Sequence, residues 1–178
     1  MVLRGTADQR LRSATCNAQT RMRLTLLRHG VAVDREDWQG ADSERILTKD
    51  GIEEATRVLK LVRNRIKAVE IWTSPWLRAR QTAELASGIW KLPLREIDWL
   101  AGDAVPTAER ASRLQAHTDV VLVGHEPDLG DLVRFLCGAR VTLKKSGLAV
   151  LKGEPRQGEM SLHCLLNPKL ALELAGKD

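Results

Sequence analysis

The chain has 178 residues, an apolar share of 43% and three cysteines. This length and composition fit one domain with an ordinary core, and the odd, scattered cysteines indicate a reduced compartment without disulfides or a zinc cluster. The net charge of +5 lies mostly in residues 1–23, which hold five arginines and one acid. Because the remainder is nearly neutral, no nucleic-acid partner is expected.

The N-terminal residues differ from the rest of the chain. Residues 1–21 are polar, arginine-rich and without periodicity, which predicts a disordered tail ahead of a single domain at 22–178. Met22 is a candidate for the true start, because an apolar run opens there. A mitochondrial transit peptide is the less supported alternative, since the stretch has a single serine. No secretory signal and no membrane-length apolar run is found, so we expect a cytoplasmic protein without a membrane partner.

From Met22 onward, short apolar runs alternate with longer amphipathic segments. Apolar runs are typical of strands buried in a parallel sheet, and apolar residues three and four apart are typical of one helix face. The predicted strands are 24–27, 69–73, 93–97 and 120–123, with a hairpin or sheet-edge pair at 148–151 and 162–166. The predicted helices are 52–62, capped by Thr48 or Asp50, then 76–90, 107–116 and 129–136. The alternation predicts an α/β fold, a mainly parallel sheet with helices on both faces.

Three polar clusters directly follow predicted strands. They are Arg28-His29-Gly30, the segment 74–83 that contains Arg78, and Gly124-His125-Glu126-Pro127. Since the carboxyl ends of parallel strands meet at one edge, two histidines and two arginines should converge there and receive an anionic substrate. Each residue alone has an ordinary structural explanation. The argument therefore depends on the occurrence of the same type of side chain at three predicted strand ends. His117 and His163 lack such neighbours, and we assign them structural roles.

The three motifs resemble those of the histidine phosphatase superfamily. Arg-His-Gly, Ser-Pro-x-x-Arg-Ala-x-Gln-Thr-Ala and Val-Gly-His-Glu-Pro occur in the order of that superfamily, between Met22 and about Leu166. The short length and the sequence Gly-His-x-Pro-x-Leu are most similar to SixA-type phosphohistidine phosphatases. The resemblance implies a phosphoglycerate-mutase-like fold and phosphoryl transfer without a metal or cofactor. It also implies His29 as the nucleophile and Arg28, Arg78 and His125 as the phosphate pocket.

These roles agree with the chemistry of the side chains. An imidazole with a pKa near 6.5 is largely neutral at physiological pH, so a lone pair of His29 can attack phosphorus without a separate base. Two arginine forks can engage the equatorial oxygens of the transferred group in the absence of a metal. We expect a bound phosphoryl group to raise the pKa of His125, which would add a third positive donor.

The sequence does not identify a general acid for the reaction. Ester-cleaving members of the superfamily place a Glu in the loop after the third strand, but residues 98–103 contain none. Glu96 falls within the predicted strand, and Asp98 or Asp103 could substitute, but nothing in the sequence selects one. An imidazole leaving group needs less proton assistance than an alkoxide. The missing Glu, which SixA-type enzymes also lack, therefore favours a phosphohistidine substrate.

Three functions remain open on the sequence. The first is dephosphorylation of histidine on a partner protein such as a phosphotransfer domain, which would place the chain in signal transduction. The short loop 30–48 favours such a large substrate because it leaves little material for a lid. The second is a small-molecule phosphomonoesterase or mutase, and the third is a noncatalytic phosphate-binding adaptor.

Two surface features have alternative interpretations. Trp38, Trp76 and Trp99 either line the rim of the pocket or, as we favour, cover the edge of the core. Lys144 and Lys145, beside Ser146, belong either to a docking face or to a solvated turn. The oligomeric state is not predicted.

Overall fold

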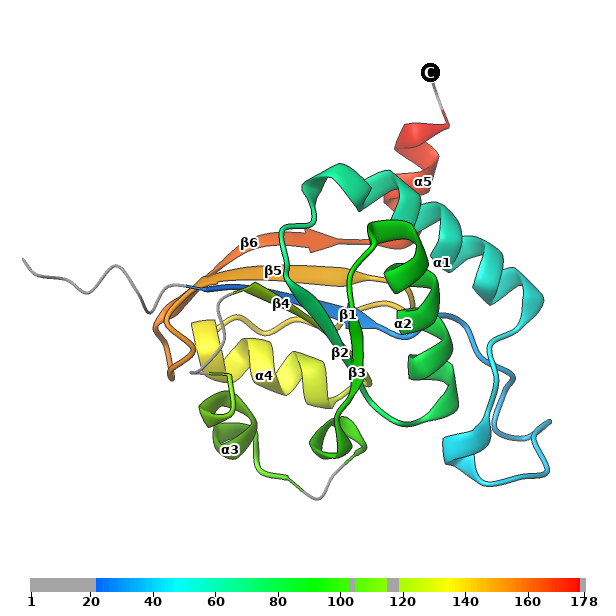
Figure 1. Ribbon diagram of the computed structural model, residues 1–178, viewed down its shortest axis with the longest axis horizontal. Coiled ribbons are helices and arrows are strands. Elements are labelled where there is room, and N and C mark those ends of the chain that lie inside the picture. Colours follow the sequence, from blue (N-terminus) through cyan, green and yellow to red (C-terminus); the bar gives the residue numbers. More distant parts are fainter. Residues whose placement is uncertain (1–21, 103–104, 115–118, 177–178) are drawn as a thin grey trace, which may run out of the picture.

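The computed structural model describes residues 22–102, 105–114 and 119–176. They form one six-stranded sheet of order β3-β2-β4-β1-β5-β6 (Figure 1). The pairs β1–β4, β2–β4 and β2–β3 are parallel, whereas β5 pairs antiparallel with β1 and with β6. The prediction of a mainly parallel sheet with a C-terminal strand pair at its edge is therefore confirmed. The strands are β1 (Met22–Arg28), β2 (Glu70–Thr73), β3 (Leu94–Glu96), β4 (Asp119–Gly124), β5 (Leu148–Gly153) and β6 (Met160–Leu166).

Helices cover both faces of this sheet, as predicted. Alternate residues of β4 divide between two buried clusters: Val120 and Leu122 pack with leucines of α4, and Val121 and Val123 pack with apolar residues of α1 and α2. A strand apolar on both faces is what a buried parallel sheet requires. The helices are α1 (Lys49–Val62), α2 (Leu77–Trp90), α3 (Thr107–Ser112), α4 (Asp128–Cys137) and α5 (Pro168–Ala175), with 3-10 turns η1 (Asp42–Glu44), η2 (Arg63–Arg65) and η3 (Asp98–Leu100).

The structure settles one open point about the helices and differs from the prediction in two others. Of the two candidate caps of α1, Thr48 is confirmed, because its Oγ1 accepts a hydrogen bond of 2.9 Å from Gly51 N. Helix α3 ends at Ser112, short of the predicted residue 116. Helix α5 was not predicted, although it begins with the signals of a helix start, an Asn167 cap followed by Pro168.

Some predictions fall on residues that the structure does not describe. The predicted tail 1–21, the candidate acid Asp103 and His117 lie outside the described residues. Within the described part of the chain, no helix has both the length and the apolar character to cross a membrane.

Candidate active site

The three polar clusters meet at one edge of the sheet, as the sequence predicts. Strand β4 lies between β1 and β2, so the carboxyl ends of all three strands are adjacent. His29 N donates to Gly124 O at 3.1 Å, and Ser74 N donates to Val123 O at 3.0 Å. The rings of His29 and His125 come within 5.1 Å of each other, centroid to centroid. Both side chains are buried, with 5% and 6% exposure.

His29 is held in one tautomer and one orientation. Its Nδ1 lies 2.7 Å from Gly30 O, a bond in which the ring nitrogen must be the donor, so the lone pair is on Nε2. Arg78 Nε donates to that Nε2 at 3.3 Å. Burial first, and the positive charges of Arg78, Arg28 and Lys145 in addition, lower the pKa of His29 to about 3, although the bond to Gly30 opposes the shift. The imidazole is therefore neutral and presents Nε2 to the pocket.

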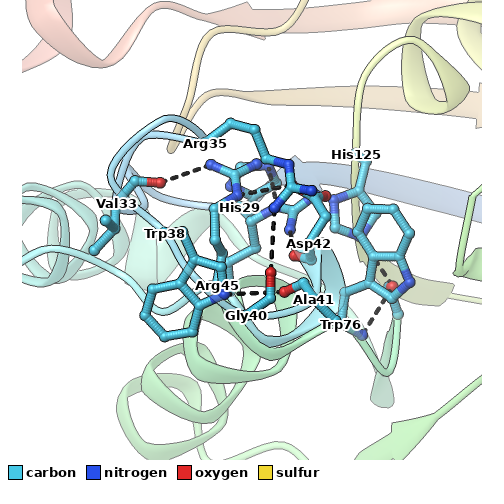
Figure 2. Close-up of polar contacts among 12 residues, drawn as sticks. His29, Val33, Arg35, Trp38, Gly40, Ala41, Asp42, Arg45, Trp76 and His125 are labelled. Atoms are coloured by element: carbon cyan, nitrogen blue, oxygen red, sulfur yellow. Dashed lines mark hydrogen bonds and ion pairs between the residues drawn. The ribbon is translucent and has the colours of Figure 1, made fainter.

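Asp42 occupies the guanidinium fork of Arg78. Nη1 of Arg78 donates to Asp42 O at 2.7 Å and Nη2 to Asp42 Oδ2 at 3.0 Å, and the guanidinium stacks 4.6 Å from the centroid of the Trp76 ring. Burial alone would raise the pKa of Asp42, but the charges of Arg78 and Arg45 hold it below its ordinary value. Figure 2 shows the Asp42 side chain among the side chains of the site.

Asp42 was missed by the sequence analysis. It is one of five acidic residues in the loop 34–44, and no spacing or motif distinguishes it from the other four. The fold selects it, because the 3-10 turn η1 points its carboxylate at the first turn of α2. Asp42 Oδ1 also accepts a bond of 2.9 Å from Arg45 Nε, and Arg45 Nη1 donates to Val33 O at 2.7 Å. The loop is thereby fixed against the pocket (Figure 2).

His125 has one satisfied and one unsatisfied ring nitrogen. Nε2 lies 2.9 Å from Ser74 Oγ, and the buried Nδ1 has no hydrogen-bond partner among the described residues. Burial first, then the neighbouring charges of His29 and Arg78, lower the pKa of His125 to about 3. In the free site His125 is thus neutral, whereas the charged form was expected only with a phosphoryl group bound beside it.

Arg28 is oriented by the turn between α4 and β5. Its Nη1 donates to Leu143 O at 2.7 Å, while Leu143 N donates to Glu126 Oε1 at 2.8 Å. Its buried Nε has no partner among the described residues. The charge of Arg28 contributes to the lowered pKa of both histidines, which places it within electrostatic reach of the pocket.

Helix α2 fixes the loop after His29 through the Gln-Thr pair of its motif. Thr82 Oγ1 accepts from Gly30 N at 3.0 Å and donates to Arg78 O at 2.7 Å. Gln81 Oε1 accepts from Leu47 N at 2.8 Å. These two side chains hold the loops on either side of the site.

The described candidate acids lie elsewhere. Glu96 is exposed and pairs with Arg80 at 3.6 Å, and Asp98 is an exposed residue that begins η3. Neither has a recorded contact with His29, Arg78 or His125. In the described part of the chain, no group of three or more His, Cys, Asp or Glu side chains is placed to hold a metal ion.

The three rim tryptophans separate into different environments. Trp76 lies 4.8 Å from the ring of His125, centroid to centroid, so it does line the pocket. Trp99 packs edge-on against Trp72 and onto the core, as the interpretation we favoured expects. Trp38 Nε1 donates to Ala41 O at 3.0 Å and so belongs to the loop that carries Asp42.

Comparisons with known proteins agree with this geometry. A solved structure of the protein histidine phosphatase SixA with tungstate superposes with a TM-score of 0.74 at 25% identity, covering 84% of this chain and 99% of that one. The α-ribazole phosphatase of Shigella flexneri shares the fold, with a TM-score of 0.65 at 21% identity over 83% of this chain and 97% of its own. An uncharacterised protein of Picosynechococcus sp. is 37% identical over 145 residues, which is 74% of this chain and 85% of that protein.

The family assignment rests on a direct match as well as on these relatives. The model of the histidine phosphatase superfamily (branch 1) matches residues 24–115, which include two of the three motifs. The third motif follows β4 and contributes His125 to the same pocket. This chain belongs to the histidine phosphatase superfamily, and its fold is that of SixA.

Proposed function

We propose that the chain is a cytoplasmic phosphohistidine phosphatase, which removes the phosphoryl group from a histidine of a partner protein through a phospho-His29 intermediate. One observation carries the proposal: a buried, neutral imidazole whose Nδ1 is bonded to Gly30 O and whose Nε2 faces Arg78. A fixed lone pair beside a cation is the arrangement that in-line attack on phosphorus requires.

The first half of the reaction transfers the phosphoryl group to the enzyme. His29 Nε2 attacks phosphorus as the phosphorus–nitrogen bond of the substrate breaks, and the substrate imidazole leaves with the electron pair and takes a proton from water. Arg78 and Arg28 supply positive charge to the equatorial oxygens, and His125 Nδ1 supplies a further contact. In the second half, the oxygen of a water molecule attacks phosphorus and the bond between phosphorus and His29 Nε2 breaks. The electron pair returns to Nε2 and restores the neutral imidazole, phosphate leaves, and a proton of the water passes to solvent.

The carboxylates of the site support a nitrogen leaving group. The carboxylate bonded to Arg78 is that of Asp42, whose lowered pKa keeps it ionised and unable to donate a proton. Among the described residues, Glu96 and Asp98 are turned to the surface instead. An imidazole leaves with little help from an acid, whereas an alkoxide needs one. The partner protein would be a phosphotransfer domain of a signalling pathway.

A small-molecule phosphomonoesterase is the alternative within the same superfamily, and a noncatalytic adaptor is the alternative outside catalysis.

Incubation with a phosphohistidine-bearing protein should trap an acid-labile, alkali-stable phosphoryl label on the wild type and none on His29→Ala. His163→Ala is the matched control, because His163 is exposed on β6, and it should keep the label. Absence of any label on the wild type would favour the adaptor. Faster turnover of p-nitrophenyl phosphate than of the phosphohistidine protein would favour the esterase.

A further inference from the structure

A shallow surface groove of about 440 Å³ adjoins the candidate active site. Arg28 is part of its lining, so the groove and the phosphate pocket share a residue. The other walls come from α1, from the turn that precedes β5 and from the start of α5, which packs against α1 (Figure 1). Val31 and the buried Pro168 give the groove apolar surface. The catalytic steps described above use no group of this groove other than Arg28.

The charge of the groove is strongly positive. Lys144, Lys145 and Lys169 line it together with Arg28, against the single carboxylate of Glu54. Lys144 and Lys169 are exposed, and Lys145 is half-buried. Within the described residues, no ion pair joins any of these three lysines to Glu54 or to another acid. Uncompensated positive charge in a concave surface attracts anionic groups and concentrates them there.

The groove is fixed relative to the nucleophile. Ser146 N donates to His29 O at 3.1 Å, and Gly147 N donates to Lys144 O at 2.7 Å, so the lysine-bearing turn is bonded to the backbone of His29 itself. The charge of Lys145 also contributes to the lowered pKa of His29, which shows that the groove and the pocket share one electrostatic environment. A ligand held at His29 therefore has its flanking groups beside the lysines.

We infer that this groove, the lysine groove, binds an acidic segment that flanks the phosphohistidine of the partner protein. The inference rests on the proposed function and deepens it, because it names the chemistry of the substrate surface. Carboxylates of the segment pair with the three ammonium groups, and its aliphatic parts contact Val31 and Pro168. The lysine pair 144–145 then belongs to a docking face, one of the two interpretations that the sequence leaves open.

Three phosphohistidine peptides of equal length, with acidic, neutral or basic flanks, test the inference. They are compared on the wild type and on a double variant of the groove, Lys144→Gln and Lys169→Gln, which leaves in place Lys145, whose charge acts on His29. The matched control removes the same charge from exposed lysines that precede the amino ends of β2 and β3, at the opposite rim of the sheet. It carries Lys67→Gln and Lys91→Gln.

The wild type should turn over the acidic peptide with a kcat/KM about tenfold above that of the neutral peptide, as expected for several partly exposed ion pairs acting together. The groove variant should lose most of this preference while its turnover of the neutral peptide stays within about twofold of wild type. The control variant should keep the preference. Raising the salt concentration should weaken it in the wild type, because exposed charges are screened.

Equal turnover of the three peptides by the wild type, or an equal loss of preference in the control variant, would overturn the lysine groove and leave the phosphatase proposal standing. Fluorescence anisotropy with the unphosphorylated acidic peptide tests the groove without catalysis, and so covers the case in which the phosphatase proposal fails and the groove still binds. Binding that is lost in the groove variant supports the inference even if no label ever appears on His29. Absence of such binding together with absence of acidic preference rejects it.

Discussion

At the scale of single residues, the ion pair between Asp42 and Arg78 is the feature with the clearest consequence. Arg78 is 4% exposed, and a buried guanidinium depends on its partners for both charge balance and orientation. Asp42 aligns it so that Nε faces His29. In the proposed reaction the carboxylate is thus a positioning group for the nucleophile, and an incoming phosphoryl group would share the guanidinium of Arg78 with it.

We expect Asp42→Asn to lower kcat/KM by roughly tenfold to a hundredfold, since a hydrogen bond to a buried charged group contributes about 1.5–3 kcal/mol. The loss should fall on kcat, because Arg78 would no longer be aligned with His29. Steady-state kinetics on a phosphohistidine substrate measure it. Asp34→Asn removes the same charge from an exposed position of the same loop and should leave kcat unchanged. A rise in activity of the Asp42 variant would mean that Asp42 does not position Arg78 and only competes with the substrate for its guanidinium.

At the scale of elements, α2 joins the sheet to the pocket through Thr82. This side chain has 0% exposure and bridges Gly30 N and Arg78 O, so both of its bonds are made inside the protein. Without it, the buried Gly30 N–H, next to the nucleophile, would have no acceptor. The helix therefore stabilises the domain and positions His29 through the same atom.

Thr82→Val keeps the shape of the side chain and removes the hydroxyl. The free energy of unfolding should fall by about 1–3 kcal/mol, because a buried donor is left unsatisfied. Urea denaturation measures the change. Thr56→Val, at a half-buried position of α1, makes the same chemical substitution and should change stability much less. A Thr82 variant as stable as wild type would show that the Gly30 N–H finds another acceptor.

The elements also show what the sequence could predict. The strands of the sheet centre carry continuous apolar runs, and the motifs after them, with His29, Arg78 and His125, came to one edge as expected from the parallel order. The apolar pattern predicts these strands correctly because a strand that is buried on both faces needs apolar side chains at nearly every position. Helix α5 was missed because it is short and partly exposed, with Leu170 and Leu174 at 55% and 61% exposure.

The missed parts of the site have a common physical cause. Asp42 reaches Arg78 across 36 positions of sequence, and Ser74 reaches His125 across 51. Such pairings are set by tertiary structure. Neither spacing nor residue type distinguishes Asp42 from its acidic neighbours, and the motif that begins with Ser74 does not show which side chain Ser74 contacts. The neutrality of His125 in the free site is likewise not predictable from the sequence, since burial sets its pKa and burial is a property of the folded chain.

At the scale of the whole molecule, the two buried histidines make stability depend on pH. Each has a folded-state pKa of about 3, below the value of about 6.5 in an unfolded chain. The unfolded state then binds more protons at acid pH, so stability is fully present above about pH 6.5 and is lost as the pH falls toward 3.

Between pH 7 and pH 5 the free energy of unfolding should fall by up to about 2 kcal/mol for each of the two histidines. Urea denaturation at the two pH values measures this slope, the change in the free energy of unfolding with pH. The double variant His29→Asn and His125→Asn should lose most of it, since amide side chains do not titrate in this range. An unchanged slope in the double variant would mean that other groups cause the acid sensitivity.

The stacking of Trp76 gives the pocket an optical signal of its own. The chain has five tryptophans and no tyrosine, and Trp76 lies against both His125 and Arg78, whereas Trp72 and Trp99 pack on each other. Indole emission responds to nearby cations and protonated imidazoles. We expect inorganic phosphate bound in the site to protonate His125 and to contact Arg78, and so to change the fluorescence of the unlabelled protein. Binding can be followed in this way before any substrate has been identified.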